Sequence, residues 1–120
     1  QTLTIFGDGL QVRDFNYIDD VVEALLMVAA TEAADGQIYN LGSDDPINLI
    51  NLARLLIEIN GGGQYELRPF PTDRKRIDIG DYYGDYRRIR SKLGWRPLVG
   101  LRDGMTRSLD YFRQHLEHYI

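Results

Sequence analysis

The chain alternates between short stretches with a strand-like pattern and segments whose apolar residues recur with helical spacing. Strands are predicted at residues 3–6, 11–15, 37–41 and 65–68, and helices at 21–30, 49–60, 86–93 and 101–119. In the last helix, apolar side chains repeat at intervals of three or four residues, which places them on one face. This order of elements predicts a mixed α/β fold, with one domain spanning residues 1–120.

Polar residues and glycines mark the expected helix ends. Asp19 or Asp20 is predicted to cap the first helix, Asn48 the second and Asp85 the third, because short polar side chains accept the free backbone N–H groups there. Gly61 directly follows the second helix, where a glycine is typical of a C-terminal cap.

Gly7, Asp8 and Gly9 resemble the start of a dinucleotide-binding loop, but the pattern is incomplete. The third glycine of that loop would fall at position 12, which is valine, and residues 11–15 alternate like a strand instead of opening a helix. The glycines are therefore predicted to form a tight turn between two strands, as in a hairpin.

Composition excludes several classes of protein and site. The 120 residues include no cysteine, so no disulfide or thiolate metal site is possible. No metal site is expected from His115 and His118 either, since a third ligand is lacking, and the acidic residues from Asp78 to Asp85 lack calcium-loop spacing. The sequence shows neither a long apolar run nor a signal peptide, which predicts a cytoplasmic protein without a membrane partner.

The net charge of −4 is unevenly distributed. Residues 1–60 carry 10 acidic and 2 basic side chains, whereas residues 61–120 carry 8 acidic and 12 basic ones. An anionic ligand is therefore expected to bind the second half, although the overall acidity argues against nucleic acid as a partner.

Five residues are candidates for ligand binding, and each also has a purely structural interpretation. Arg13 is either half of a surface ion pair or a phosphate ligand, for which its planar fork of donors is suited. Arg76 and Asp78 lie in a solvated loop or form a donor–acceptor pair for sugar or ribose hydroxyls. Tyr82 and Tyr83 pack on the core or line a ligand site.

Three segments occur in the order GDGLQVRDFNYIDDVVEALL, GQIYNLGSDDPINLINLARLL and IDIGDYYGDYRRIRSKLGWRPLVGLRDGM. Together they resemble the C-terminal, substrate-binding portion of an extended short-chain dehydrogenase/reductase, in the NAD-dependent epimerase/dehydratase group that acts on nucleotide sugars. The resemblance runs from Leu3 to about Phe112. It implies the substrate-binding lobe of such an enzyme without its N-terminal Rossmann half.

The resemblance also implies roles for individual residues. Arg13 matches the arginine that contacts the diphosphate of a UDP- or dTDP-hexose. The segment ending at Asp78 matches an Arg-x-x-Asp element for phosphate and ribose, but Lys75 stands three residues before Asp78, so Arg76 is expected to take the phosphate role. Tyr82 or Tyr83 falls where the family lines its sugar pocket.

The family's catalytic and cofactor motifs are missing from these 120 residues. There is no G-x-x-G-x-x-G loop, and none of the eight tyrosines is followed four residues later by lysine. No catalytic or cofactor-binding residue is therefore expected, and the chain alone is predicted to be inactive. NAD would be bound by the N-terminal half of a homodimeric parent enzyme, which would epimerise or dehydrate its sugar through a transient ketone. The alternative is a non-catalytic nucleotide-binding or protein-interaction module. Since the chain begins at Gln1 without methionine, a fragment is expected.

Overall fold

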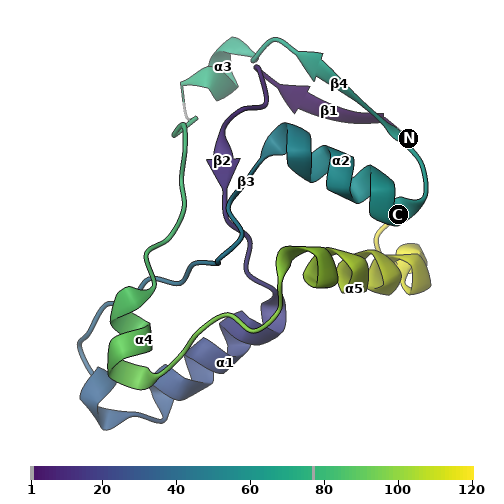
Figure 1. Cartoon of the computed structure of the whole chain (residues 1–120). Coiled ribbons are helices and arrows are strands. Elements are labelled where there is room, and N and C mark those ends of the chain that lie inside the picture. The colour runs from purple at the N-terminus through teal and green to yellow at the C-terminus, as the bar shows by residue number, and fades with distance from the viewer. Residues whose placement is uncertain (1, 77) are drawn as a thin grey trace. The chain divides into compact units, whose positions relative to one another are not determined.

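The computed structural model describes residues 2–76 and 78–120, and its mixed α/β content confirms the predicted fold class. The strands are β1 (Thr2–Phe6), β2 (Val12–Arg13), β3 (Ile47–Asn48) and β4 (Gln64–Arg68) (Figure 1). The helices are α1 (Ile18–Ala29), α2 (Leu49–Asn60), α3 (Thr72–Lys75), α4 (Arg87–Leu93) and α5 (Leu101–Gln114), with short 3-10 helices at Glu32–Ala34 and Leu116–His118. None of the helices in the described residues is both long enough and apolar enough to cross a membrane.

The chain divides into two compact units, and each unit is assembled from separated segments. The first unit contains Gln1–Arg13, Ile47–Tyr82 and Met105–Ile120. The second contains Asp14–Pro46 and Tyr83–Gly104. The single domain expected over residues 1–120 stays a prediction.

A pair of parallel strands and one helix form the centre of the first unit. β1 and β4 pair in register from Thr2↔Gln64 to Phe6↔Arg68, and α2 packs against both strands (Figure 1). Ile5 of β1 and Ala53 of α2 are buried there. Because α2 supplies the crossover between two parallel strands, its apolar face covers one side of the sheet.

The predicted turn is present, but the predicted hairpin is wrong. Gly7 and Gly9 have positive φ angles of 82° and 68°, as a turn requires. β1 nevertheless pairs with β4, while β2 pairs antiparallel with β3. The carbonyl of Gly9 accepts the N–H of Ile50 at 3.1 Å, which holds the end of the turn against the start of α2 and brings β2 beside β3.

Both predicted ends of α2 are confirmed. The Asn48 side chain accepts the N–H of Asn51 at 2.8 Å, and Gly61 follows the helix in the left-handed conformation with φ 73°. The cap also fixes the position of β3, because Asn48 is both the last residue of β3 and the N-cap residue of α2.

In the second unit, the core forms around one tryptophan. Trp95, Ile89 of α4 and Ala24 of α1 are almost completely buried together. The ring of Tyr86 meets that of Trp95 edge to face, with centroids 5.7 Å apart. Tyr39 and Leu41 pack against this cluster, in a segment that was expected to be a strand.

That strand, predicted at residues 37–41, is wrong: the segment is irregular. It contributes side chains to the tryptophan cluster, and its alternating pattern reflects this packing instead of a place in a sheet. The last helix is shorter than predicted, since α5 ends at Gln114 and only the 3-10 turn Leu116–His118 follows.

The predicted cap of α1 by Asp19 or Asp20 is also wrong. Tyr17 occupies the N-cap position but its side chain does not cap the helix, and both aspartates lie in the first turn. Asp20 is 5% exposed, and its two carboxylate oxygens accept the N–H groups of Leu98 and Val99, each at 3.0 Å. The carboxylate therefore satisfies donors from a distant loop in place of those of its own helix.

α1 exposes most of its apolar side chains. Ile18, Val22, Leu25 and Leu26 are between 44% and 63% exposed, although Ala24 on the same helix is buried. The helix is apolar around most of its circumference, as the sequence indicated, but these residues are not covered by the described chain.

We expect Asp20→Ala to destabilise the chain by about 2–4 kcal/mol, because two backbone N–H groups would lose their buried acceptor. Urea unfolding followed by the fluorescence of Trp95, the single tryptophan, measures the change. Asp19→Ala is the matched control, since Asp19 is exposed in the same helical turn, and we expect it to cost less than about 0.5 kcal/mol. If the two variants lost the same free energy of unfolding, this role of Asp20 would be contradicted.

Candidate functional site

Arg13 and Asp78, which are 65 residues apart in the sequence, meet in the first unit. Nη2 of Arg13 lies 3.4 Å from Oδ1 of Asp78. Nη1 of Arg13 donates to the carbonyl of Val12 at 2.8 Å and to the carbonyl of Gly80. One side of the guanidinium is thus held by backbone oxygens, while the other side faces a carboxylate.

The segment that carries Asp78 is fastened along β2. The N–H of Val12 donates to Oδ1 of Asp81 at 2.8 Å, and the carbonyl of Val12 accepts the N–H of Tyr82 at 2.9 Å. β2 therefore has β3 on one edge and residues 81–82 on the other. This double attachment keeps Asp78 within reach of Arg13.

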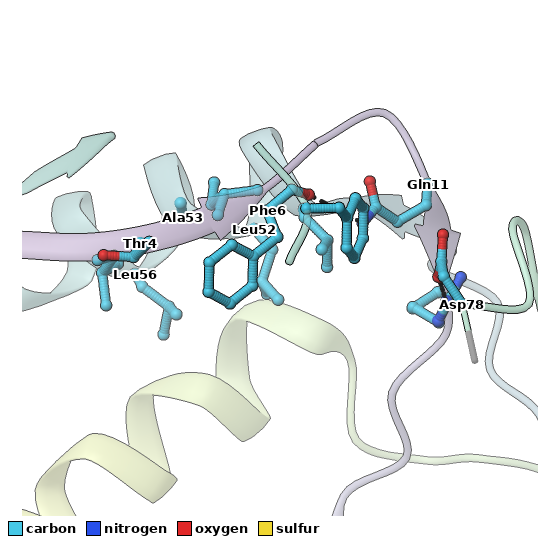
Figure 2. Close-up of a pocket in the computed structure, with 12 residues that line it drawn as sticks. Thr4, Phe6, Gln11, Leu52, Ala53, Leu56 and Asp78 are labelled. Carbon is cyan, nitrogen blue, oxygen red and sulfur yellow. Dashed lines mark hydrogen bonds and ion pairs between the residues drawn. The ribbon is translucent and has the colours of Figure 1, made fainter. Parts of the chain in front are cut away.

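A pocket of about 410 Å³ opens beside this ion pair. Figure 2 shows Asp78 and Gln11 at one end of it and Thr4 and Leu56 at the other. Its wall is mostly apolar and comes from β1, α2 and the segment after β4, with Leu3, Ile5, Phe6, Leu49, Leu52, Ala53, Leu56 and Phe70 among its residues. An apolar pocket of this size with a few polar groups at one end suits a small organic ligand that carries an anionic group.

Two phenylalanines that the sequence did not single out belong to this wall. The rings of Phe6 and Phe70 have centroids 6.1 Å apart, and the guanidinium of Arg74 lies 5.3 Å from the Phe6 centroid. A Cβ on Gly7 would stand 2.6 Å from the Phe70 ring, so glycine is needed there for space as well as for its φ angle. In the sequence, only the nearby turn glycines hint that a side chain approaches the backbone there, and they do not reveal that it is the Phe70 ring.

A second pocket of about 430 Å³ shares Asp78, Gln11 and Phe70 with the first. Of the neighbouring cations, Lys75 is among the described residues that line it, whereas Arg76 is not. Arg76 follows the short helix α3 and is exposed. Asp78 thus lines both pockets, together with Arg13 in the first and Lys75 in the second, and a phosphate role for Arg76 stays a prediction.

The two candidate tyrosines belong to different units. Tyr82 is tied to β2 through its backbone, and its side chain is 54% exposed. Tyr83 is in the second unit and is 63% exposed. Neither is among the described residues that line the two pockets, where the aromatic side chains are Phe6 and Phe70.

The hydroxyl of Tyr86, in the second unit, makes a short contact with Asp44. Its hydroxyl donates to Oδ1 of Asp44 at 2.5 Å, and this hydrogen bond raises the pKa of Tyr86 above its ordinary value. A phenol whose pKa is raised is poorly suited to act as a base near neutral pH. Among the described residues, no cluster of three or more histidine, aspartate or glutamate side chains could hold a metal ion.

Comparison with known proteins finds one family repeatedly. Residues 1–42 match the model of the NAD dependent epimerase/dehydratase family. The chain is 33% identical over 122 residues to UDP-glucuronic acid decarboxylase 1 of Xenopus tropicalis, covering 98% of this chain and 27% of that protein. The chain thus spans about a quarter of the length of this curated relative.

Solved structures give the same result. UDP-glucose 4-epimerase from Thermotoga maritima, determined with UDP-glucose, is 34% identical with a TM-score of 0.82, over 97% of this chain and 36% of that one. UDP-glucuronic acid 4-epimerase from Bacillus cereus, in complex with UDP-glucuronic acid and NAD, is 28% identical with a TM-score of 0.79, over 95% and 36% of the two chains.

We expect Asp81→Ala to detach residues 81–82 from β2, since the N–H of Val12 would lose its acceptor. Hydrogen exchange at the Val12 amide should then become roughly tenfold faster, as for an exposed backbone group that has lost a local contact. Asp81→Asn keeps an oxygen acceptor and should leave the exchange rate within about twofold of the original. If the alanine variant exchanged as slowly as the parent chain, Asp81 would not hold this segment.

Proposed function

This chain belongs to the NAD-dependent epimerase/dehydratase family, and we propose that it forms the nucleotide-sugar-binding part of one of the family's enzymes. The observation that carries the proposal is the pocket with Arg13 and Asp78 at one end and an apolar wall at the other. A nucleoside diphosphate carries a planar base whose faces can stack on aromatic side chains, a ribose with hydroxyls and an anionic group, and each has a chemical counterpart there.

The residues around the pocket suggest a role for each part of the ligand. Arg13 binds the diphosphate through Nη2, since Nη1 is held by the carbonyls of Val12 and Gly80 and the guanidinium keeps its charge. Asp78 accepts hydroxyl groups of the ribose, and Lys75 or Arg76 adds a second positive charge nearby. Phe6 and Phe70 cover the base. Tyr82 or Tyr83 contacts the sugar in the full protein.

The parent family uses NAD, but the residues present here do not fit this cofactor. The Gly7–Gly9 turn leads into β2 and not into a helix, and the ring of Phe70 fills the space beside Gly7 that a phosphate would need. We propose that NAD is bound by a Rossmann domain outside these 120 residues, in a homodimeric cytoplasmic enzyme. The exposed apolar residues of α1, Ile18, Val22, Leu25 and Leu26, would pack against that domain.

We expect UDP to bind this chain and raise its melting temperature, because a ligand that binds only the folded state stabilises it. Arg13→Ala should weaken the affinity for UDP at least about tenfold, as loss of a charge-assisted hydrogen bond does. Calorimetric titration measures the affinity. Arg13→Lys keeps the charge but not the planar guanidinium. Its affinity for UDP should lie between those of the unchanged chain and Arg13→Ala.

Arg68→Ala is the control for this experiment. Arg68 is an exposed arginine of the same unit, paired with Glu66 at 2.7 Å and outside the residues that line the pocket. It should bind UDP as the parent chain does. If UDP failed to bind, or bound Arg13→Ala unchanged, the nucleotide site would be refuted and a protein-interaction module would be the better interpretation.

The chain alone should not convert UDP-glucose in the presence of NAD. It lacks the Tyr-x-x-x-Lys pair, and the raised pKa of Tyr86 disfavours a substitute base. Chromatographic separation of UDP-hexoses after prolonged incubation measures turnover, with a complete UDP-glucose 4-epimerase as the positive control. Product formed in proportion to the amount of this chain would show that the catalytic groups lie within it.

A further inference from the structure

Asp78 faces Nη2 of Arg13, whereas backbone oxygens hold Nη1. Nη1 of Arg13 is bound to the carbonyls of Val12 and Gly80, and Nη2 faces Oδ1 of Asp78 at 3.4 Å. The side chains of Arg13 and Asp78 are 24% and 27% exposed, so solvent screens their charges only in part. An anion that approaches Nη2 from the pocket therefore meets a carboxylate already in place.

This arrangement creates a competition between anions. A phosphate group that binds Nη2 must displace the Asp78 carboxylate or lie beside it, and two neighbouring negative charges repel. A carboxylate set aside in this way also loses a hydrogen-bond donor. Binding of a bare phosphate compound thus breaks the ion pair without giving Asp78 a new partner.

A ligand that carries both an anion and hydroxyl groups avoids this loss. Its anion takes the place of Asp78 on Nη2, while a hydroxyl donates to the released carboxylate, which accepts such bonds strongly when ionised. Asp78 and Arg13 both line the 410 Å³ pocket, so one small molecule can reach both (Figure 2). The ion pair is then exchanged for two matched contacts.

We propose that Asp78 is a competing counter-ion that makes the Arg13 site selective for phosphates attached to a hydroxyl-bearing group over bare pyrophosphate. This inference rests on the proposed nucleotide site. It assigns to Asp78 a negative function, exclusion of the wrong anion, in addition to contact with the right one.

The test compares UDP with inorganic pyrophosphate, titrated calorimetrically at one ionic strength without divalent metal. The parent chain should bind pyrophosphate at least about tenfold more weakly than UDP. Asp78→Asn should tighten pyrophosphate about three- to tenfold, the size expected when one partly exposed neighbouring charge is removed. The same variant should leave the affinity for UDP unchanged or lower it, because the amide is a poorer acceptor than the carboxylate.

Asp81→Asn is the matched control. It removes one negative charge from the same segment, keeps the oxygen that accepts the N–H of Val12, and does not touch the ion pair. This variant should change the affinities for UDP and for pyrophosphate by the same small factor. The inference is overturned if Asp78→Asn raises the affinities for UDP and pyrophosphate equally. It is also overturned if the pyrophosphate affinity of this variant is unchanged or lower.

The outcomes separate this inference from the proposed function. If UDP binds in an Arg13-dependent way but the ratio of the two affinities does not change in Asp78→Asn, the nucleotide site stands and the counter-ion role fails. If UDP does not bind while Asp78→Asn still gains pyrophosphate affinity, the nucleotide assignment and the selectivity both fail, and Asp78 only repels anions at Arg13. If neither UDP nor pyrophosphate binds the unchanged chain or Asp78→Asn, the nucleotide site and the counter-ion role are both refuted.

Discussion

The two residues of β2 hold the first unit's candidate site together. In a strand, successive residues present their backbone groups to opposite edges, so Val12 can bond residues 81–82 while β3 lies along the other edge. Arg13 follows directly, and its side chain adds bonds to Val12 and Gly80. The geometry of the ion pair with Asp78 thus depends on a very short strand whose partners come from distant parts of the sequence.

Local patterns were sufficient where local interactions decide the structure. Asn48 and Gly61 were correctly assigned to the ends of α2, because the bonds they make lie within a few residues. The hairpin at Gly7 and the cap at Asp20 were wrong, since β1 and the Asp20 carboxylate find their partners about 60 and 80 residues away in the described chain. Periodicity does not encode which of several possible partners is nearest.

The candidate site shows the same division. Arg13 and Asp78 were identified from residue chemistry and from the family resemblance, and the structure brings them together. Phe6 and Phe70 were not, because one reads as a strand residue and the other lies in an irregular segment. The family assignment itself rested on the order of three segments, and it is confirmed by relatives and solved structures across nearly the whole chain.

The interleaving of the two units has a consequence for biosynthesis. Each unit needs segments that are far apart in the sequence: the second is complete only with residues up to Gly104, and the first only with Met105–Ile120. On the ribosome, β1 emerges long before β4, and α1 long before Trp95. The early segments must therefore wait unpaired, with their apolar faces open to chaperones or to aggregation. The second unit can therefore close before the first, because its last segment ends at Gly104 and the first unit still lacks Met105–Ile120 at that stage.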